Sequence, residues 1–283
     1  MAIRFVTDST SYIPDELVKE YSISVAPQVL IWGDETFRDG VDIQPDEFYA
    51  RLRTAKVMPT TSQVSVVSMQ GIFQDLIDKG NDVLGVFISP KLSGTMQSCI
   101  QAREALGAAA SKITLVDSTT TAMALGFMVL TAARAARQGA TLPECLELLE
   151  KGRDHVGVYF AVDTLEFLHR GGRIGGATRF IGSALNLKPI LELKDGHVEA
   201  VERVRTKTKA VDRLLELVAG RVRGKTNVRL ATLHANAEQE ARDLLQRASH
   251  DLNAVESILS SVSPVVGTHA GPGTVGLAYM AGM

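Results

Sequence analysis

The sequence is poor in cysteine and in aromatic residues. It has 283 residues, of which 2 are cysteines (Cys99 and Cys145) and 5% are Phe, Trp or Tyr. Two cysteines so far apart exclude a disulfide framework and the paired spacing of a zinc site, and they favour a reducing compartment. Because 45% of the residues are hydrophobic but few are aromatic, the core must be mainly aliphatic.

An excess of one charge and a long apolar run are also lacking. The formal net charge is -2 and the pI is near 6.3, which argues against nucleic acid as the main partner. No apolar run approaches the roughly 20 residues that a membrane span needs. The start, MAIRFVTDSTS, has no apolar stretch after a basic head, unlike a secretory signal. We therefore expect a cytoplasmic protein without stable membrane insertion.

Short apolar runs alternate with helical patterns in the first half of the chain. Runs rich in β-branched residues and bounded by Gly, Pro or Ser predict strands at IRFVTDS and at residues 83–89, 112–118 and 156–162. Helical patterns lie between them, and Thr141 followed by Glu144 three places later forms a capping box. This alternation predicts an α/β fold with a parallel sheet covered by helices.

The second half has a different pattern. The segment LKPILELKDGHVEAVERVRTKTK contains two strand-like runs joined at Asp195-Gly196, which is a hairpin signal. A helix, the strand VRLATLHA, another helix and a β-rich end follow. We therefore expect two domains: an N-terminal α/β domain with the parallel sheet at residues 1–155, and a smaller mixed α/β domain at residues 156–283.

Two glycine-rich stretches imitate nucleotide-binding motifs. Residues 220–226, GRVRGKT, are one residue short of a phosphate loop and follow a predicted helix instead of preceding one. Residues 271–276 match G-x-G-x-x-G, but the seven residues that remain cannot form a βαβ unit. Ser93 has Lys91 and not glycine two places before it, so it is not in a nucleophile elbow. We expect no cofactor and no metal.

Three hydroxyl-rich loops follow or lie close to apolar runs, at residues 59–63, 91–95 and 268–273. In an open parallel sheet, ligands bind beyond the carboxyl ends of the strands. The second loop follows the strand that ends near Ser89 and begins a helix, whose free amides and hydroxyls suit an oxyanion. Ordinary alternatives remain: Ser93 and Thr61 could simply start helices, and His269 could be a turn residue.

Seven sequence blocks occur in this order: FVTDSTSYIP, PTTSQ, ISPKLSGTMQS, LVDSTTTAMALG, VDTLEFLHRGGRIGG, LNLKPILELKDG and GTHAGPGTVGL. Together they resemble the DegV family, the fatty-acid-binding subunits of bacterial fatty acid kinase. The resemblance implies two α/β domains with a ligand buried between them. It also implies a non-catalytic protein that presents the carboxylate of a long-chain fatty acid to a separate ATP-dependent kinase. The acyl-phosphate would feed phospholipid synthesis.

The same resemblance implies which residues surround the ligand. Those that would bind or wall in the carboxylate are Thr61, Ser93, Gly94, Thr95 and His269. Those expected as secondary contacts or at the pocket mouth are Ser62, Arg170 and Arg173. A buried carboxylate must be hydrogen-bonded, and two hydroxyls with a histidine can satisfy it without an arginine. Such a clamp would leave one carboxylate oxygen available for phosphorylation.

A run of basic residues follows the predicted hairpin. Arg203, Arg205, Lys207 and Lys209 alternate with neutral residues, so on a strand all four would share one face. The ordinary interpretation is a solvated face or a charged sheet edge. The functional interpretation is a patch, led by Arg203 and Arg205 and completed by the arginines of HRGGR, that docks the kinase or its nucleotide phosphates.

Two other functions remain open. A serine hydrolase or acyltransferase could use Ser93 as the nucleophile and His269 as the base. A binding protein for another amphiphile, such as a retinoid-like or branched lipid, would keep the polar loops and change the tail pocket. The apolar stretches 122–130 and 180–187 could line an acyl tail or belong to the ordinary core, so the chain length of the ligand does not follow from the sequence.

Overall fold

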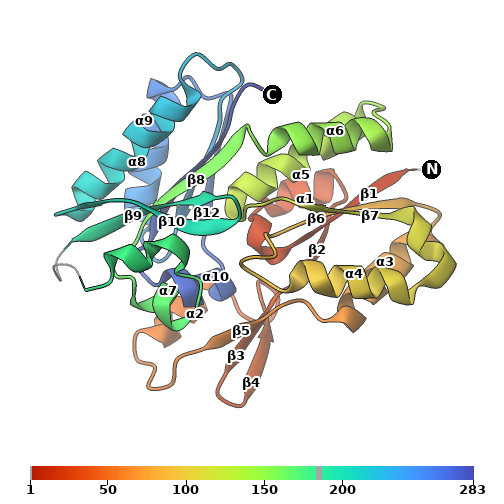
Figure 1. Ribbon diagram of the computed structural model, residues 1–283, viewed down its shortest axis with the longest axis horizontal. Coiled ribbons are helices and arrows are strands. Elements are labelled where there is room, and N and C mark those ends of the chain that lie inside the picture. The colour runs from red at the N-terminus through yellow and green to blue at the C-terminus, as the bar shows by residue number, and fades with distance from the viewer. Residues whose placement is uncertain (1, 183–186) are drawn as a thin grey trace.

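The structure is a computed structural model that describes residues 2–182 and 187–283 (Figure 1). Its first sheet has four parallel strands in the order β2-β1-β6-β7, with the bounds Ser24–Ala26, Ile3–Asp8, Asp82–Phe87 and Ile113–Asp117. Three of these strands coincide with predicted apolar runs. The parallel sheet predicted for the first half is therefore confirmed.

The second sheet is mixed and has six strands. In the order β10-β9-β8-β13-β11-β12 their bounds are His197–Val204, Lys188–Lys194, Val156–Ala161, Val275–Met280, Arg229–His234 and Glu256–Ser261. The predicted hairpin is present: β9 and β10 are antiparallel, and Asp195 and Gly196 between them have φ of 50° and 81°. Strand β8 pairs antiparallel with both β9 and β13, so it does not extend the parallel sheet.

The third sheet is small and was not expected from the sequence. It contains β4, β3 and β5, with the bounds Glu35–Arg38, Val29–Trp32 and Thr60–Ser62. Helix α2 (Pro45–Leu52) packs beside it through Phe48, whose ring meets the Trp32 ring edge-on at a centroid distance of 5.5 Å. Strands of three or four residues are too short for an alternating pattern to predict them.

The longer helices separate and cover the two large sheets (Figure 1). Helices α3 (Val66–Asp78) and α4 (Thr95–Ala105) cover the outer face of the parallel sheet, and α8 (Lys207–Val222) and α9 (Glu238–Asp251) cover that of the mixed sheet. Helix α5 (Ala122–Arg137) contacts both sheets, and α6 (Leu142–Gly152) packs on it. The remaining helical segments are η1 (Ser9–Ser11), α1 (Asp15–Glu20), η2 (Gly107–Lys112), α7 (Glu166–Arg170), η3 (Gly175–Phe180) and α10 (Pro264–Ala270).

Helix α5 is buried on every side along its first half. Residues 122–130 are all buried, and a helix that is apolar all round belongs in a core. Its small residues let neighbouring elements approach closely: a Cβ on Gly126 would lie 2.5 Å from the carbonyl oxygen of Ser11. Strands of both large sheets therefore share one hydrophobic cluster with this helix.

The structure does not place the basic run at residues 203–209 on one strand. Arg203 lies on β10, but the strand ends at Val204, and the side chain of Thr206 accepts a hydrogen bond from the backbone N–H of Lys209. Thr206 thereby caps α8, so Lys207 and Lys209 are helical. The four basic side chains thus do not share one strand face, because a local cap ends the extended segment. The apolar stretch predicted at 180–187 lies partly outside the described residues.

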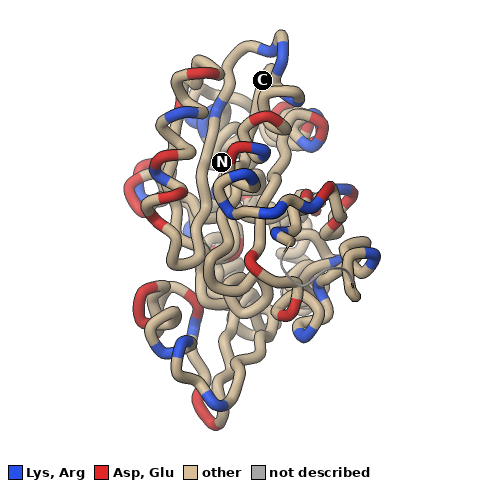
Figure 2. Tube along the Cα trace, turned by 90° about the vertical axis from the view of Figure 1, so that its left-hand side faces the viewer, with Lys and Arg blue, Asp and Glu red and all other residues tan. Residues whose placement is uncertain are grey.

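Charged residues of both signs are interspersed along the trace in the view of Figure 2. Within residues 2–182 and 187–283, no helix is both long enough and apolar enough to cross a membrane. Over the same ranges, no three His, Cys, Asp or Glu side chains gather where they could hold a metal ion.

A partly buried ion cluster joins α5 to the mixed sheet. Arg134 of α5 donates to both carboxylate oxygens of Glu256 on β12, with N–O distances of 2.8 and 2.6 Å. Arg229 of β11 places its Nε 3.6 Å from the same carboxylate and donates to Thr131 of α5 at 2.8 Å. The three charged side chains are only 18–24% exposed. One carboxylate therefore compensates two guanidinium groups at this junction.

Glu256→Gln should destabilise the fold, because it leaves Arg134 and Arg229 facing each other without a counter-charge. Removing one partner of a largely buried pair costs several kcal/mol, and partial exposure reduces this to about 2–3 kcal/mol. Urea unfolding measures the loss. Glu147→Gln, which removes the exposed i,i+4 partner of Lys151, should have a much smaller effect. Equal effects of the two substitutions would contradict this role of the cluster.

Candidate functional site

A cavity lies between the two large sheets, near the start of α5. One part of its wall is apolar and comes largely from the mixed sheet and α10. These residues are Val158, Phe160, Leu168, Leu193, Val198, Leu233, Val262, Val265, Val266, Ala270 and Gly276. Gly276 of β13 pairs with Phe160 and with Leu233 on the neighbouring strands, so a residue without a side chain lies between two larger ones. The wall there is smooth and aliphatic apart from Phe160.

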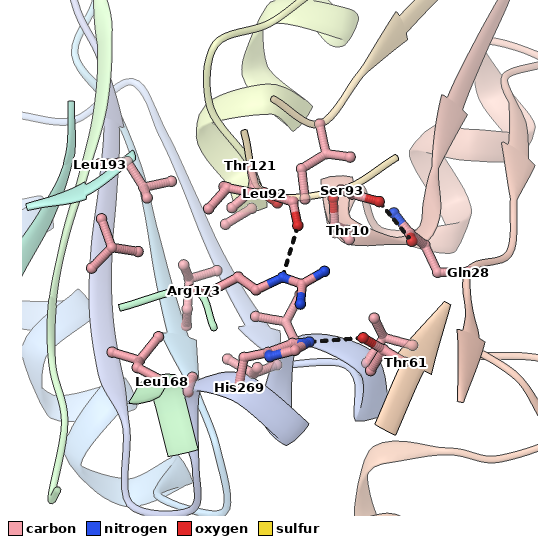
Figure 3. Close-up of a pocket in the computed structure, with 18 of the residues that line it drawn as sticks. Thr10, Gln28, Thr61, Leu92, Ser93, Thr121, Leu168, Arg173, Leu193 and His269 are labelled. Carbon is pink, nitrogen blue, oxygen red and sulfur yellow. Dashed lines mark hydrogen bonds between the residues drawn. The ribbon is translucent and has the colours of Figure 1, made fainter. Parts of the chain in front are cut away.

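The other part of the wall is polar (Figure 3). It is lined by Thr10, Gln28, Thr61, Ser62, Gln63, Ser93, Gly94, Thr121, Arg173 and His269. These residues come from the carboxyl ends of the parallel strands, the small third sheet, the segment after α7, and α10. A site with one polar and one apolar end suits an amphiphile better than a uniformly polar metabolite.

Thr61 and His269 meet across the cavity wall although they are 208 residues apart in the chain. Thr61 lies on β5, which pairs with β3, so it belongs to an edge strand and not to a helix start. His269 lies in the last turn of α10. The Oγ1 of Thr61 is 2.8 Å from the Nε2 of His269. The packing of α10 against the small sheet therefore creates this pair.

His269 is neutral at physiological pH. Burial, followed by the charge of nearby Arg173, lowers the pKa of its imidazole to about 4. The Nδ1 atom is buried without a hydrogen-bond partner in the described part of the chain, and a Cβ on Gly171 would collide with it. The ring therefore offers only its Nε2 side to the polar end of the cavity.

Arg173 supplies the positive charge at this end of the cavity. Its Nε donates to the carbonyl of Leu92 at 3.1 Å and its Nη1 to the carbonyl of Gly171 at 2.6 Å. Figure 3 shows the guanidinium group directed between Ser93 and Thr61. Carbonyls orient a guanidinium but do not neutralise it, so the charge stays available to an anion. The sequence resemblance implied that Arg173 lies at the pocket mouth, and two hydroxyls with a histidine were expected to satisfy the carboxylate without an arginine.

The Ser93 loop precedes α4, as the sequence predicted, but Ser93 is not the residue at the N-cap position. Gly94 occupies that position, and the Oγ of Ser93 accepts a hydrogen bond from the backbone N–H of Thr95 at 3.3 Å. The same Oγ lies 2.9 Å from the Oγ1 of Thr95 and 3.3 Å from the Oε1 of Gln28. Ser93 thus helps to start the helix while its side chain lines the cavity.

The structure brings most of the residues predicted to bind the carboxylate or to lie at the pocket mouth to one place. Those that line the cavity are Thr61, Ser62, Ser93, Gly94, Arg173 and His269. Thr95 is fully buried behind Ser93 and contacts its hydroxyl. Arg170 forms an ion pair with Glu166 at 2.5 Å and lies outside the cavity. Arg203 lies over the Phe180 ring at 4.7 Å, and Arg205 is exposed in the turn before α8.

A second, outer hollow lies on the far side of the Thr61–His269 pair. It shares Thr61, Arg173 and His269 with the cavity and is also lined by Leu52, Met58, Pro59, Thr60, Phe167, Arg170, Gly171 and Thr268. These three shared side chains therefore lie between the polar end of the cavity and the second hollow. A ligand head group there would be close to anything bound in the outer hollow.

Comparison with known proteins places the chain in a family. A family model described as "Uncharacterised protein, DegV family" matches residues 2–282. This chain belongs to the DegV family. Its relatives include a DegV domain-containing protein of Clostridium perfringens, which is 35% identical over 281 residues and aligned over 99% of each chain. The DegV protein of Bacillus subtilis is 33% identical over 280 residues, again with 99% of each chain covered.

Two solved DegV structures share the whole fold. A structure titled as fatty acid binding of a DegV family protein from Thermus thermophilus has a TM-score of 0.93, 35% identity and coverage of 99% of this chain and 100% of that one. The structure of DegV from Bacillus subtilis, described as a fatty acid binding protein, has a TM-score of 0.90, 32% identity and 99% coverage of both chains. The two-domain DegV-like α/β fold predicted from the sequence blocks is therefore confirmed.

A buried polar network lies behind the polar end of the cavity, and it was not predicted as functional. Asp8, at the carboxyl end of β1, accepts hydrogen bonds from Thr10 and from the backbone N–H of Ile88. Asp39 accepts from the Oγ of Ser9 at 2.6 Å and from the N–H of Val265, in the first turn of α10, at 3.1 Å. The TDSTS segment spans the end of the first predicted strand, at the edge of the sheet where ligands bind, and this position was a usable signal. Gln28 and Asp39 lie in no recognisable motif.

Asp39 makes the stability of the protein depend on pH. Burial raises the pKa of its carboxyl to about 6, from an ordinary value of 3.8, although Ser9 and the Val265 amide counteract this. The folded protein therefore binds more protons than the unfolded chain between these two values, and its stability falls as the pH rises through that window. At about 1.4 kcal/mol per pH unit, the carboxylate costs roughly 3 kcal/mol above pH 6.

Asp39→Asn should flatten this part of the stability profile, because the amide does not titrate. We expect the free energy of unfolding of the unchanged protein to fall by roughly 2 kcal/mol more than that of the variant between pH 4 and pH 6.5. Urea unfolding at several pH values measures the difference. Asp75→Asn, at an exposed position paired with Lys79, serves as the control. Parallel profiles for the unchanged protein and Asp39→Asn would refute the assignment.

Proposed function

We propose that this DegV protein binds a long-chain fatty acid in the cavity, with the carboxylate at the polar end and the tail along the apolar wall. The observation that carries the proposal is one cavity with hydroxyls, a neutral imidazole and a guanidinium at one end and an aliphatic surface at the other. The solved relatives described as fatty acid binding support it. In this proposal, residues 1–155 supply most of the head-group side chains and residues 156–283 most of the tail contacts.

Proton placement at the Thr61–His269 pair favours an anionic head group. With its proton on Nε2, the neutral imidazole donates to the Thr61 oxygen, and the Thr61 hydroxyl proton becomes free for a ligand oxygen. Ser93 offers a second hydroxyl, and Arg173 adds the charge that a buried carboxylate needs. The carboxylate would thus be held by two hydroxyl donors near one arginine.

The apolar wall accounts for the affinity expected of such a ligand. Each buried methylene contributes about 0.8 kcal/mol, so a sixteen-carbon tail could gain roughly 12 kcal/mol. The entropy of association and the ordering of side chains offset several of these. Aliphatic side chains contact a flexible tail without imposing polar specificity.

We further propose that the protein presents the bound carboxylate to an ATP-dependent fatty acid kinase and does not itself catalyse the reaction. The outer hollow supports this, because it reaches Thr61, Arg173 and His269 from the surface. Arg170 borders that hollow, and the exposed Arg205, with Arg203, would contribute to docking. Acyl-phosphate formed by the pair would then feed phospholipid synthesis.

The side chains around Ser93 do not favour the alternative of a serine hydrolase. Ser93 contacts Gln28 and Thr95, whereas the Nε2 of His269 faces Thr61. In the described residues, the Nδ1 of His269 has no acid to orient it. A nucleophile needs a base within hydrogen-bond reach and a third group that orients the base.

The double substitution of Thr61→Ala and Ser93→Ala should weaken fatty acid binding about a hundredfold, because each removes a donor worth about 1.5 kcal/mol to a charged head group. Mass spectrometry of an organic extract should find near-stoichiometric fatty acid in the purified unchanged protein and much less in the variant. Thr60→Ala, next to Thr61 but outside the cavity lining, is the control. An unchanged protein that neither carries nor takes up fatty acid would overturn the proposal.

Arg205→Glu should lower the rate at which the partner kinase phosphorylates the bound fatty acid, about tenfold or more at low salt, while leaving fatty acid affinity unchanged. A reversed charge at a docking surface slows association, and salt screens the effect. Acyl-phosphate formation at two salt concentrations measures it. Arg223→Glu makes the same charge change at the opposite end of α8. If both variants behave alike, Arg205 does not dock the kinase.

A further inference from the structure

Gln28 lies in the polar end of the cavity and has no role in the binding arrangement described above. The residue is 2% exposed. It stands between β2 and β3, where its backbone is fixed from both sides: its N–H donates to the Oγ of Ser9 at 3.1 Å, and its carbonyl accepts from the N–H of Asp39 at 2.9 Å. A buried amide on a fixed backbone has few places to turn, and here it faces Ser93 (Figure 3).

The amide of Gln28 connects Ser93 to the buried carboxylate of Asp8. Its Oε1 accepts from the Ser93 hydroxyl at 3.3 Å, and its Nε2 lies 3.5 Å from the Oδ1 of Asp8. Asp8 accepts three shorter hydrogen bonds, at 2.6–3.0 Å, from Thr10 and Ile88. The contact with Gln28 is therefore the weakest of the four.

Proton counting shows that this arrangement must change when a carboxylate binds. The Ser93 hydroxyl has one proton, and when Thr95 donates to the Ser93 oxygen that proton is directed at the Oε1 of Gln28. A ligand carboxylate beside Ser93 would bring a second acceptor to the same proton. Turning the amide over would exchange its oxygen for its nitrogen, and an N–H would then face the carboxylate. The contact given up would be the long one to Asp8, and the amide oxygen would then face the Oδ1 of Asp8. Burial raises the pKa of that carboxyl, which favours a protonated Asp8 able to donate to the turned amide.

We propose that Gln28 is a third head-group residue: on binding, its side-chain amide turns over, frees the Ser93 proton and donates an N–H of its own to the ligand carboxylate. This inference rests on the proposed function and extends it. The site then selects an anionic head group over a neutral one through a residue that supplies a donor only when an acceptor arrives. Arg173 attracts the charge, and Gln28 completes its hydrogen bonds.

The test compares hexadecanoic acid with hexadecan-1-ol, which has the same tail and a neutral head group. Gln28→Glu has nearly the same shape and, once ionised, has only acceptors. Because burial and the neighbouring Asp8 raise the pKa of a carboxyl at this position, binding is measured at alkaline pH. There the variant should lower affinity for the acid by more than tenfold and leave affinity for the alcohol within about twofold. Gln28→Met removes donor and acceptor together and should weaken the acid about tenfold. Gln74→Glu on α3, where the side chain bonds Asp78, is the control.

Two results would overturn the inference. If the Gln28 substitutions weaken acid and alcohol equally, Gln28 only supports the fold around the cavity. If neither substitution changes acid binding, the amide does not contact the head group. Both results differ from failure of the proposed function, in which the unchanged protein would bind neither ligand. Circular dichroism of each variant shows that it is folded before the comparison is made.

Discussion

The burial of helix α5 between the two large sheets is the constraint on which the rest of the molecule depends. The helix is apolar on all sides along residues 122–130, so each of its faces must pack against another element. Strands of the parallel sheet and of the mixed sheet supply those partners and share one core with it. Because Gly126 has no side chain, the Ser9–Ser11 turn can rest directly on the helix. Asp8 immediately precedes that turn and Asp39 accepts a hydrogen bond from its Ser9, so the turn positions both buried acids.

The cavity lies where this shared core ends, and its two chemical characters follow from its two sources. The carboxyl ends of the parallel strands bring hydroxyls and free amides, as they do in other open α/β sheets. The mixed sheet brings an aliphatic face with a glycine, Gly276, between Phe160 and Leu233. Helix α10 then closes the polar end with His269. An amphiphilic ligand matches such a boundary between two different walls.

The polar end of the cavity combines a neutral imidazole, that of His269, with the fixed positive charge of Arg173. Burial and the neighbouring Arg173 keep His269 uncharged, with its pKa lowered to about 4. Arg173 in turn is held by two backbone carbonyls, which orient its guanidinium without cancelling its charge. Behind them, Asp39 joins the Ser9 turn to the first turn of α10, so the same buried acid supports both sides of the site at a cost in stability above pH 6.

The sequence by itself determined the local features, because each depends on residues close together in the chain. The strands of the parallel sheet, the Asp195-Gly196 hairpin and the Thr141–Glu144 capping box all follow from short patterns. The basic run at 203–209 shows the limit of such patterns, since one capping threonine converts an expected strand into a helix start. Only the tertiary structure decided that Thr61 meets His269 across 208 residues, that Arg173 faces the cavity and that Gln28 reaches Ser93. Those contacts depend on how two sheets pack on one buried helix, and no periodicity in the sequence encodes the relative placement of elements that distant.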